Sequence, residues 1–168
     1  MALFSITLEN LQQLFVRELR DLYDAEIQIT HALPKMIVAA HNSELQDALQ
    51  EHLQVTKNQI SRLDRIFDML NEKASGETCK GMKGLLKEGD EIASADGDPS
   101  TIDAGIITAA QRVEHYQMAG YGTLRTYAEL LGQPEMARLL QETLDEEKEA
   151  DETLTDIAST VNVQSKAA

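Results

Sequence analysis

The chain has 168 residues, of which 42% are hydrophobic and 26% are charged, a composition typical of one globular domain with a sizeable core. Its formal net charge of −14 excludes a nucleic-acid-binding surface, which needs lysine and arginine to neutralise phosphates, and fits a protein that attracts cations. A single cysteine, Cys79, excludes an internal disulfide and a metal site made of cysteines alone.

The amino-terminal stretch, MALFSITLENLQQLF, has neither a basic start nor an uninterrupted apolar run, so we expect no signal peptide. No segment approaches the length of a membrane-spanning helix. With three prolines and nine glycines the chain has few breaks, which favours long helices. We therefore expect an all-α, cytoplasmic protein with no membrane partner.

Two long helices are predicted in the first half of the chain, because apolar residues recur three or four positions apart. The first spans about residues 7–42, opens at Thr7 and passes through Pro34, which should kink it. The second spans about residues 43–71 and has Ser43 as its cap.

The segment that follows, residues 72–99, holds five of the nine glycines. A short helix is expected within it, at about residues 80–94, between two turn-rich stretches. The segment is too long to join two antiparallel neighbours directly. It is therefore predicted to be a crossover connection inside one domain that spans residues 1–168.

Two more long helices are predicted at about residues 100–131 and 134–161, with Gly132 ending the first and Pro134 in the first turn of the second. We expect the residues after 161 to be frayed. Two antiparallel helix pairs joined by a long crossover are the plan of a ferritin-like four-helix bundle, here with a short extra helix between helices 2 and 3.

Four carboxylates stand at positions where the apolar faces of three of these helices would otherwise continue. They are Glu26 in the first long helix, Glu114 in the third, and Glu147 and Asp151 in the fourth. Buried carboxylates that lie together repel one another unless something neutralises them, and these faces carry almost no lysine or arginine. A pair of divalent iron or manganese ions is the better compensation, because carboxylates and imidazole suit these metals.

An alternative remains open for each of these residues. A single glutamate in an amphipathic helix commonly lies at the edge of the apolar face, and His52 lies on the flank of its predicted face, between Leu49 and Leu53. The Glu-x-x-His pairs of many ferritin-like di-iron proteins are absent. Any metal site would therefore be rich in carboxylates, with at most one histidine.

Segments from about Leu8 to Ala158 resemble the YciE/YciF family of bacterial stress-associated proteins. The similar stretches are LYDAEIQITHALPKM, EHLQVTKNQISRLDRIFDML, CKGMKGLLKEGDE, AAQRVEHYQMAGYGTL and ETLDEEKEADETLTDIA. The resemblance implies a ferritin-like four-helix bundle, a homodimer and a dinuclear metal centre, and it leaves the biochemical activity open.

The resemblance also implies a set of metal ligands. Carried over by position, they are Glu26, His52, Glu114, Glu147 and Asp151. Gln117 stands where the family commonly has glutamate. An amide oxygen can still coordinate but brings no charge, so we expect one metal position to be weakened.

Three functions follow from these observations. The first is a stress protein with a dinuclear iron or manganese site that handles oxygen, peroxide or ferrous iron, with Tyr23 or Tyr121 donating a hydrogen bond near the metals. The second is a structural or interaction bundle whose metal site is incidental or degenerate, which Gln117 favours. The third is iron storage in a shell, which the expected homodimer disfavours.

Overall fold

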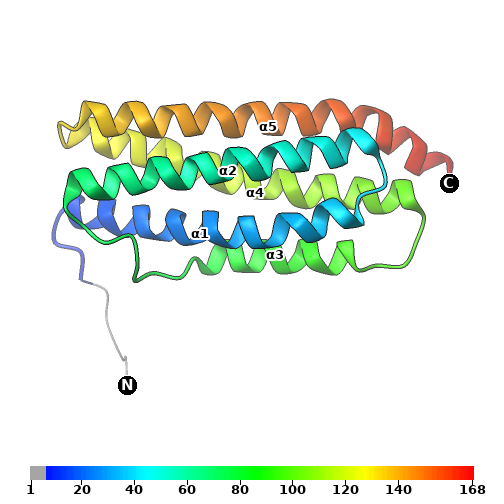
Figure 1. The fold of residues 1–168 in the computed structure, drawn as a ribbon, viewed down its shortest axis with the longest axis horizontal. Helices are drawn as coiled ribbons and strands as arrows, with labels where there is room; N and C mark the ends of the chain where they lie inside the picture. Colours follow the sequence, from blue (N-terminus) through cyan, green and yellow to red (C-terminus); the bar gives the residue numbers. More distant parts are fainter. Residues whose placement is uncertain (1–6) are drawn as a thin grey trace, which may run out of the picture.

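The computed structural model describes residues 7–168, and the part of the amino-terminal segment before residue 7 lies outside the described residues. Five helices and no strands form the described chain (Figure 1). The helices are α1 (Leu11–Ala39), α2 (Ser43–Leu70), α3 (Lys80–Ala93), α4 (Pro99–Leu130) and α5 (Pro134–Ala167). None of them combines the length and the apolarity needed to span a bilayer.

The four long helices lie side by side as a bundle, and α3 packs against α1 and α4 along one side of it (Figure 1). Short turns make α1 antiparallel to α2 and α4 antiparallel to α5. The crossover, residues 71–98, carries the chain back along the bundle, so that α2 and α4 run in the same direction. The predicted all-α, ferritin-like bundle with a short helix in its crossover is confirmed.

Side-chain caps set the starts of three of the four long helices, and they differ from those predicted. Helix α1 begins at Leu11 rather than about residue 7, because the Asn10 side chain accepts a hydrogen bond from Gln13 N at 2.9 Å. Asn42 caps α2 and Asp98 caps α4 in the same way. Asn10 lies three residues after the expected Thr7, and Asn42 lies one residue before the expected Ser43.

Helix α5 continues to Ala167, six residues beyond the predicted end near residue 161. Val161 is buried in the core, so the helix is still anchored at that point. Beyond it, Ser165 Oγ lies 3.0 Å from Thr101 Oγ1 of α4. Lys166 lies in the last turn, where its positive charge interacts favourably with the helix dipole. The prediction of a frayed tail was wrong because these contacts hold the last two turns.

The core consists of two apolar clusters, one toward each end of the bundle. One cluster includes Ile29, Leu45 and Ile106, and the other includes Phe15, Leu63 and Leu124. Between them the four long helices contribute buried polar side chains, which we call the central polar layer. Its members are Glu26, His52, Thr56, Gln59, Glu114, Gln117 and Glu147.

The crossover is attached to the bundle at Cys79, the residue before α3. Cys79 N donates to Asp24 Oδ2 at 2.8 Å, and Gln28 Nε2 donates to Cys79 O at 3.1 Å. The thiol lies 3.0 Å from Tyr116 Oη, which in turn donates to Asp21 Oδ2 at 3.0 Å. Burial raises the pKa of the Cys79 thiol to about 11, so the thiol stays protonated and can donate to Tyr116.

A buried carboxylate from α4 holds the turn between α1 and α2. Asp103, 3% exposed, accepts hydrogen bonds from His41 N at 2.7 Å and Asn42 N at 2.8 Å, one at each carboxylate oxygen. Both oxygens are therefore satisfied by backbone N–H groups of the turn.

Candidate metal centre

The helical spacing of polar side chains places the central polar layer halfway along the bundle. Glu26 comes from α1, His52 from α2, Glu114 and Gln117 from α4, and Glu147 from α5. Residues three or four apart share a helix face, so Glu114 and Gln117 point together into the core. Five of the six predicted metal-site residues are thus buried and brought together.

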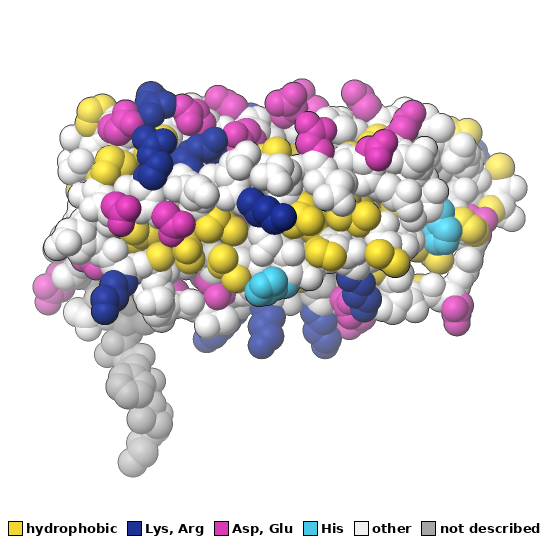
Figure 2. All heavy atoms as spheres, viewed as in Figure 1, with side chains coloured by type: hydrophobic (Ala, Val, Ile, Leu, Met, Phe, Trp, Pro, Cys, Tyr) yellow, Lys and Arg dark blue, Asp and Glu magenta, His cyan; other side chains and the backbone are white. Residues whose placement is uncertain are grey.

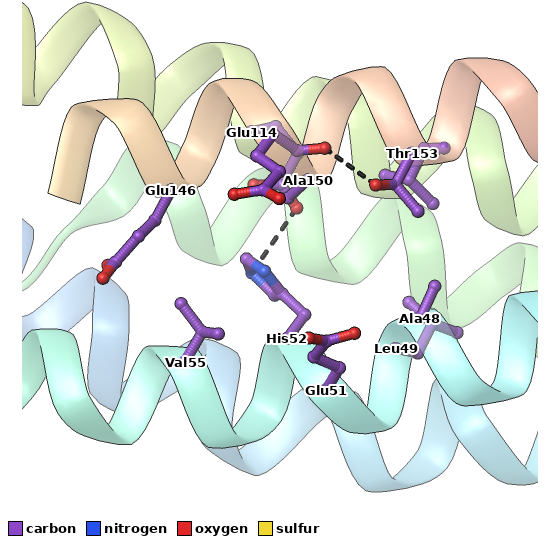
Figure 3. Close-up of a pocket in the computed structure, with 11 residues that line it drawn as sticks. Ala48, Leu49, Glu51, His52, Val55, Glu114, Glu146, Ala150 and Thr153 are labelled. Atoms are coloured by element: carbon purple, nitrogen blue, oxygen red, sulfur yellow. Dashed lines mark hydrogen bonds and ion pairs between the residues drawn. The ribbon is translucent and has the colours of Figure 1, made fainter. Parts of the chain in front are cut away.

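Three of these side chains form the tightest group. His52, Glu114 and Glu147 each offer one ligand atom, and these atoms all lie within 4.8 Å of one another. His52 Nε2 is 3.4 Å from Glu114 Oε1, and Figure 3 shows the imidazole of α2 pointing across the bundle at that carboxylate. A buried group of one imidazole and two carboxylates can hold a metal ion.

Gln117 connects this group to Glu26. Its Nε2 donates to Glu26 Oε1 at 2.8 Å and lies 3.4 Å from Glu147 Oε1. The Tyr121 hydroxyl also donates to Glu26 Oε1. Of the two tyrosines considered from the sequence, Tyr23 and Tyr121, it is therefore Tyr121 that contacts the layer.

Tyr23, the other option, lies elsewhere. Its ring packs edge-on against Phe67, with the ring centroids 5.8 Å apart, and its hydroxyl faces Asp64. Asp64 lies on the outside of α2. Tyr23 therefore contributes to packing between α1 and α2 and does not contact the carboxylates of the layer.

Asp151 lies at the rim and not within the buried group. Its side chain is 20% exposed, Gln111 Nε2 donates to its Oδ1 at 3.2 Å, and His115 Nε2 lies 3.3 Å from its Oδ2. Glu147, one turn earlier, points inward instead. The structure thus separates the two carboxylates of α5 that the sequence placed on one face.

Gln59 belongs to the layer although the sequence did not predict it. Its Nε2 donates to Glu147 Oε1 at 2.5 Å and contacts Glu146 Oε2 at 3.2 Å. The signal was the spacing of His52, Thr56 and Gln59, which continues to the buried Leu63. The apolar residues Leu53 and Ile60 indicate a neighbouring face of α2 instead, and both are only partly buried.

Burial changes the protonation of the three carboxylates. Removal from water raises the pKa of Glu114 to about 7, and it raises the pKa of Glu26 and of Glu147 well above the ordinary value. The charge of Glu147 raises the pKa of Glu26 further, and the facing carboxyl of Glu114 does the same to Glu147. Without a cation, the group therefore retains protons near neutral pH.

Arg62, which lies at the edge of the layer, does not neutralise this group. Arg62 pairs through both terminal nitrogens with Glu146, at 2.8 and 2.9 Å, and also donates to Thr143 Oγ1 at 2.6 Å. Its charge is thus used at the edge of the layer. Within residues 7–168, no lysine or arginine forms an ion pair with Glu26, Glu114 or Glu147.

Unpaired atoms give a direct test of whether a metal fits. Six buried side-chain atoms of the layer have no hydrogen-bond partner among the described residues: Glu26 Oε2, His52 Nε2, Gln59 Oε1, Glu114 Oε2, Gln117 Oε1 and Glu147 Oε2. Buried polar atoms are normally paired, because leaving one unpaired costs about 1–3 kcal/mol. Carboxylate and amide oxygens and an imidazole nitrogen are all donors that iron and manganese accept, so the residues present fit a metal.

Fold and site together define the class: a ferritin-like helical bundle with a carboxylate-rich group in its core. A family model described as a domain of unknown function, DUF892, matches residues 10–168. Protein YciF of Escherichia coli (strain K12) is 42% identical over 163 residues, which cover 96% of this chain and 98% of YciF. The chain belongs to the DUF892 family, and the predicted resemblance to YciF is confirmed.

Solved structures agree with this assignment. The crystal structure of the E. coli stress protein YciF matches with a TM-score of 0.89 at 41% identity, covering 92% of this chain and 98% of that one. YcfI from Rhodopseudomonas palustris matches with a TM-score of 0.87 at 46% identity, covering 91% and 98%. A protein from Xanthomonas campestris, 20% identical with a TM-score of 0.74 and covering 92% and 94%, shares the fold alone.

Proposed function

We propose that the central polar layer binds a pair of divalent iron or manganese ions. The observation that carries this proposal is the set of six unpaired acceptor atoms, contributed by all four long helices. A cation would pair with them and offset the burial and the mutual repulsion that raise the pKa values of the carboxylates.

The proposed ligands fall into two parts that share the middle of the layer. His52 lies at one side, next to Glu114, and Glu26 lies at the other, joined through Gln117. Glu147 contacts both parts, which supports two metal positions rather than one. Asp151, predicted as a ligand, is left outside this set because it pairs with Gln111 and His115.

Bound iron or manganese would supply redox chemistry toward dioxygen, peroxide or ferrous iron. The chain's own residues would orient the ligands: Tyr121 and Gln117 hold Glu26, and Gln59 holds Glu147. We propose a role in the stress response on the basis of the family, because the E. coli relative is a stress protein.

We also propose that the protein is a cytoplasmic homodimer. Figure 2 shows apolar side chains along the middle of one face, over α1 and α2, and acidic side chains along the edge formed by α5. Ile27, Leu53 and Ile60 are partly exposed apolar residues of α1 and α2. A light-scattering mass close to the 18.6 kDa of one chain would contradict the dimer.

One observation favours a non-catalytic bundle as the second candidate. Gln117 donates a hydrogen bond to Glu26 from within the layer. An uncharged amide therefore already satisfies one carboxylate oxygen that a cation would otherwise pair with. In this case the layer would be a structural feature with an incidental metal site.

The test is a calorimetric titration of chelator-treated protein with Mn²⁺ and, without oxygen, with Fe²⁺. We expect saturable binding that Glu114→Gln reduces at least about 10-fold, while Glu152→Gln, an exposed neighbour on α5, leaves it unchanged. Gln117→Glu should strengthen binding. Absence of binding to the unaltered chain, or equal binding by both Gln variants at 114 and 152, would contradict the proposal.

A second measurement separates the two candidate functions once binding is established. Metal-loaded protein should consume added peroxide or oxidise added ferrous iron, and the Glu114→Gln variant should not. Binding without either reaction would support the structural candidate.

A further inference from the structure

Two cavities connect the central polar layer with the surface, and they reach it from different sides. One, of about 140 Å³, lies between α2 and α5. The other, of about 170 Å³, lies between α1, α3 and α4 and also touches α2. Leu49, His52 and Glu114 line both cavities and lie between them. The remaining linings differ in chemistry.

The cavity between α2 and α5, which we call the α2–α5 opening, is lined by four glutamates and His52 together with small and apolar side chains, among them Leu49 and Leu154. Glu51 and Glu149 lie at its exposed end, and within residues 7–168 neither forms an ion pair. Glu146 also lines it but is paired with Arg62. Figure 3 shows Glu51 and Glu146 on the two sides of the space into which the imidazole of His52 projects.

The inner end of this opening presents two buried atoms without partners. His52 is 8% exposed and Glu114 is 3% exposed, and His52 Nε2 and Glu114 Oε2 have no hydrogen bond within the described chain. The acidic outer end of the opening is therefore continuous with two buried, unpaired atoms that we propose as metal ligands. These buried atoms distinguish the opening from an ordinary cluster of surface carboxylates.

The cavity on the other side, which we call the apolar cavity, has a different lining. Ile29, Leu33, Leu86 and Val113 are among the side chains that face it. At its outer end Lys35 pairs with Asp90, so these two charges offset each other and neither attracts a cation. A hydrated cation would lose its water against this lining without gaining ligands, which is strongly unfavourable.

We infer that divalent cations reach the central polar layer through the α2–α5 opening and not through the apolar cavity. This inference rests on the proposed metal binding. Glu51 and Glu149 would raise the local concentration of cations by their unpaired negative charge. His52 and Glu114 would then replace the water ligands of the arriving ion. The apolar cavity, excluded as a cation route, serves as the internal control.

The steric test compares two matched alanines. Ala150 lines the α2–α5 opening and Ala32 lines the apolar cavity, and both are partly buried residues within long helices. Binding of Co²⁺ to the full-length, chelator-treated protein is followed by stopped-flow absorption and, at equilibrium, by titration. We expect Ala150→Leu to slow association by roughly an order of magnitude with little change in affinity, and Ala32→Leu to leave the rate unchanged.

The electrostatic test uses variants that carry no risk of overpacking. Glu51→Gln and Glu149→Gln together should slow Co²⁺ association about threefold or more at low salt, and the difference should vanish at high salt. The control is Glu152→Gln, which removes a charge three residues after Glu149 on α5 but outside the lining of the opening.

The outcomes distinguish the route from the site. Unchanged rates in Ala150→Leu and in the double Gln variant, or equal slowing by Ala32→Leu, would overturn the route while metal binding itself stands. Failure of the unaltered chain to bind Co²⁺, Mn²⁺ or Fe²⁺ at equilibrium would overturn the proposed function and the route with it.

Discussion

Asp103 and the central polar layer both bury carboxylates in the same bundle, but they do so in opposite ways. Asp103 has a backbone N–H within 2.8 Å of each oxygen. In the layer, Glu26, Glu114 and Glu147 each have one oxygen without any partner in the described chain. The protein therefore supplies hydrogen-bond donors to both oxygens of Asp103. It leaves acceptor atoms without donors in the layer, where we propose that a cation binds.

The contrast shows that burial alone does not identify a metal site. Asp103 is as deeply buried as Glu114, yet its surroundings are complete without any added ion. What sets the layer apart is its shortage of donors. Tyr121 and Gln117 donate to one oxygen of Glu26, and Gln59 donates to one oxygen of Glu147. The remaining acceptors need either protons or metal.

The largest expected effect is stabilisation by metal. At a free Mn²⁺ concentration about 1,000 times the dissociation constant, the free energy of unfolding should rise by about 4 kcal/mol. Urea unfolding at neutral pH, with and without Mn²⁺, measures it. If Mn²⁺ at saturating concentration left the unfolding curve in place, the comparison between the two regions would lose its basis.

The second effect is a loss of stability with rising pH in the metal-free protein. Folding raises the pKa of Glu114 from 4.5 to about 7, so the folded state holds this proton more tightly than the unfolded state does. The contribution is fully present below pH 4.5 and is lost as the pH rises toward 7, which amounts to roughly 3 kcal/mol. The raised pKa values of Glu26 and Glu147 extend the loss to higher pH.

Urea unfolding of chelator-treated protein from pH 5 to pH 8 measures this dependence. Glu114→Gln should flatten it, because an amide does not titrate. A stability that stays level or increases over this range in the unaltered chain would show that the layer is not held together by protons.

The third effect comes from the other side of the comparison. Asp103→Ala removes the acceptors of His41 N and Asn42 N and should destabilise the protein by about 2 kcal/mol. The loss should be the same with and without Mn²⁺, since Asp103 lies outside the layer. A loss that disappears on addition of metal would mean that the two regions are coupled.

The smallest effect is expected at the rim. Asp151→Asn should change Mn²⁺ affinity by less than about threefold, since Asp151 lies outside the buried group and any field effect there is screened. Calorimetric titration beside Glu114→Gln measures the contrast. A loss as large as that of Glu114→Gln would place Asp151 among the ligands after all.

Much of the bundle could be predicted from local signals. The apolar spacing predicted all four long helices, and the glycine-rich segment predicted the crossover. Both signals are local, because each depends on residues that lie close together in the sequence. Helix starts were displaced because Asn10, Asn42 and Asp98 compete with nearby serine and threonine as caps. The end of α5 depends on the contact of Ser165 with Thr101, which no local pattern reveals.

The site was predicted less evenly, for a physical reason. Glu26, Glu114 and Glu147 interrupt apolar faces and could be found one helix at a time. Gln59 was missed because an apolar pattern through Leu53 and Ile60 gave a neighbouring face of α2. Which of two adjacent faces turns inward depends on how α2 packs against α5, and that is decided by the whole bundle.

The attachment of the crossover at Cys79 has a practical consequence. This is the only thiol in the chain, it is completely buried, and its raised pKa keeps it in the unreactive protonated form. An alkylating reagent can therefore label only those molecules in which the crossover has come away from α1. The rate of labelling would report how often the bundle opens along this side, with no added probe and no engineered residue.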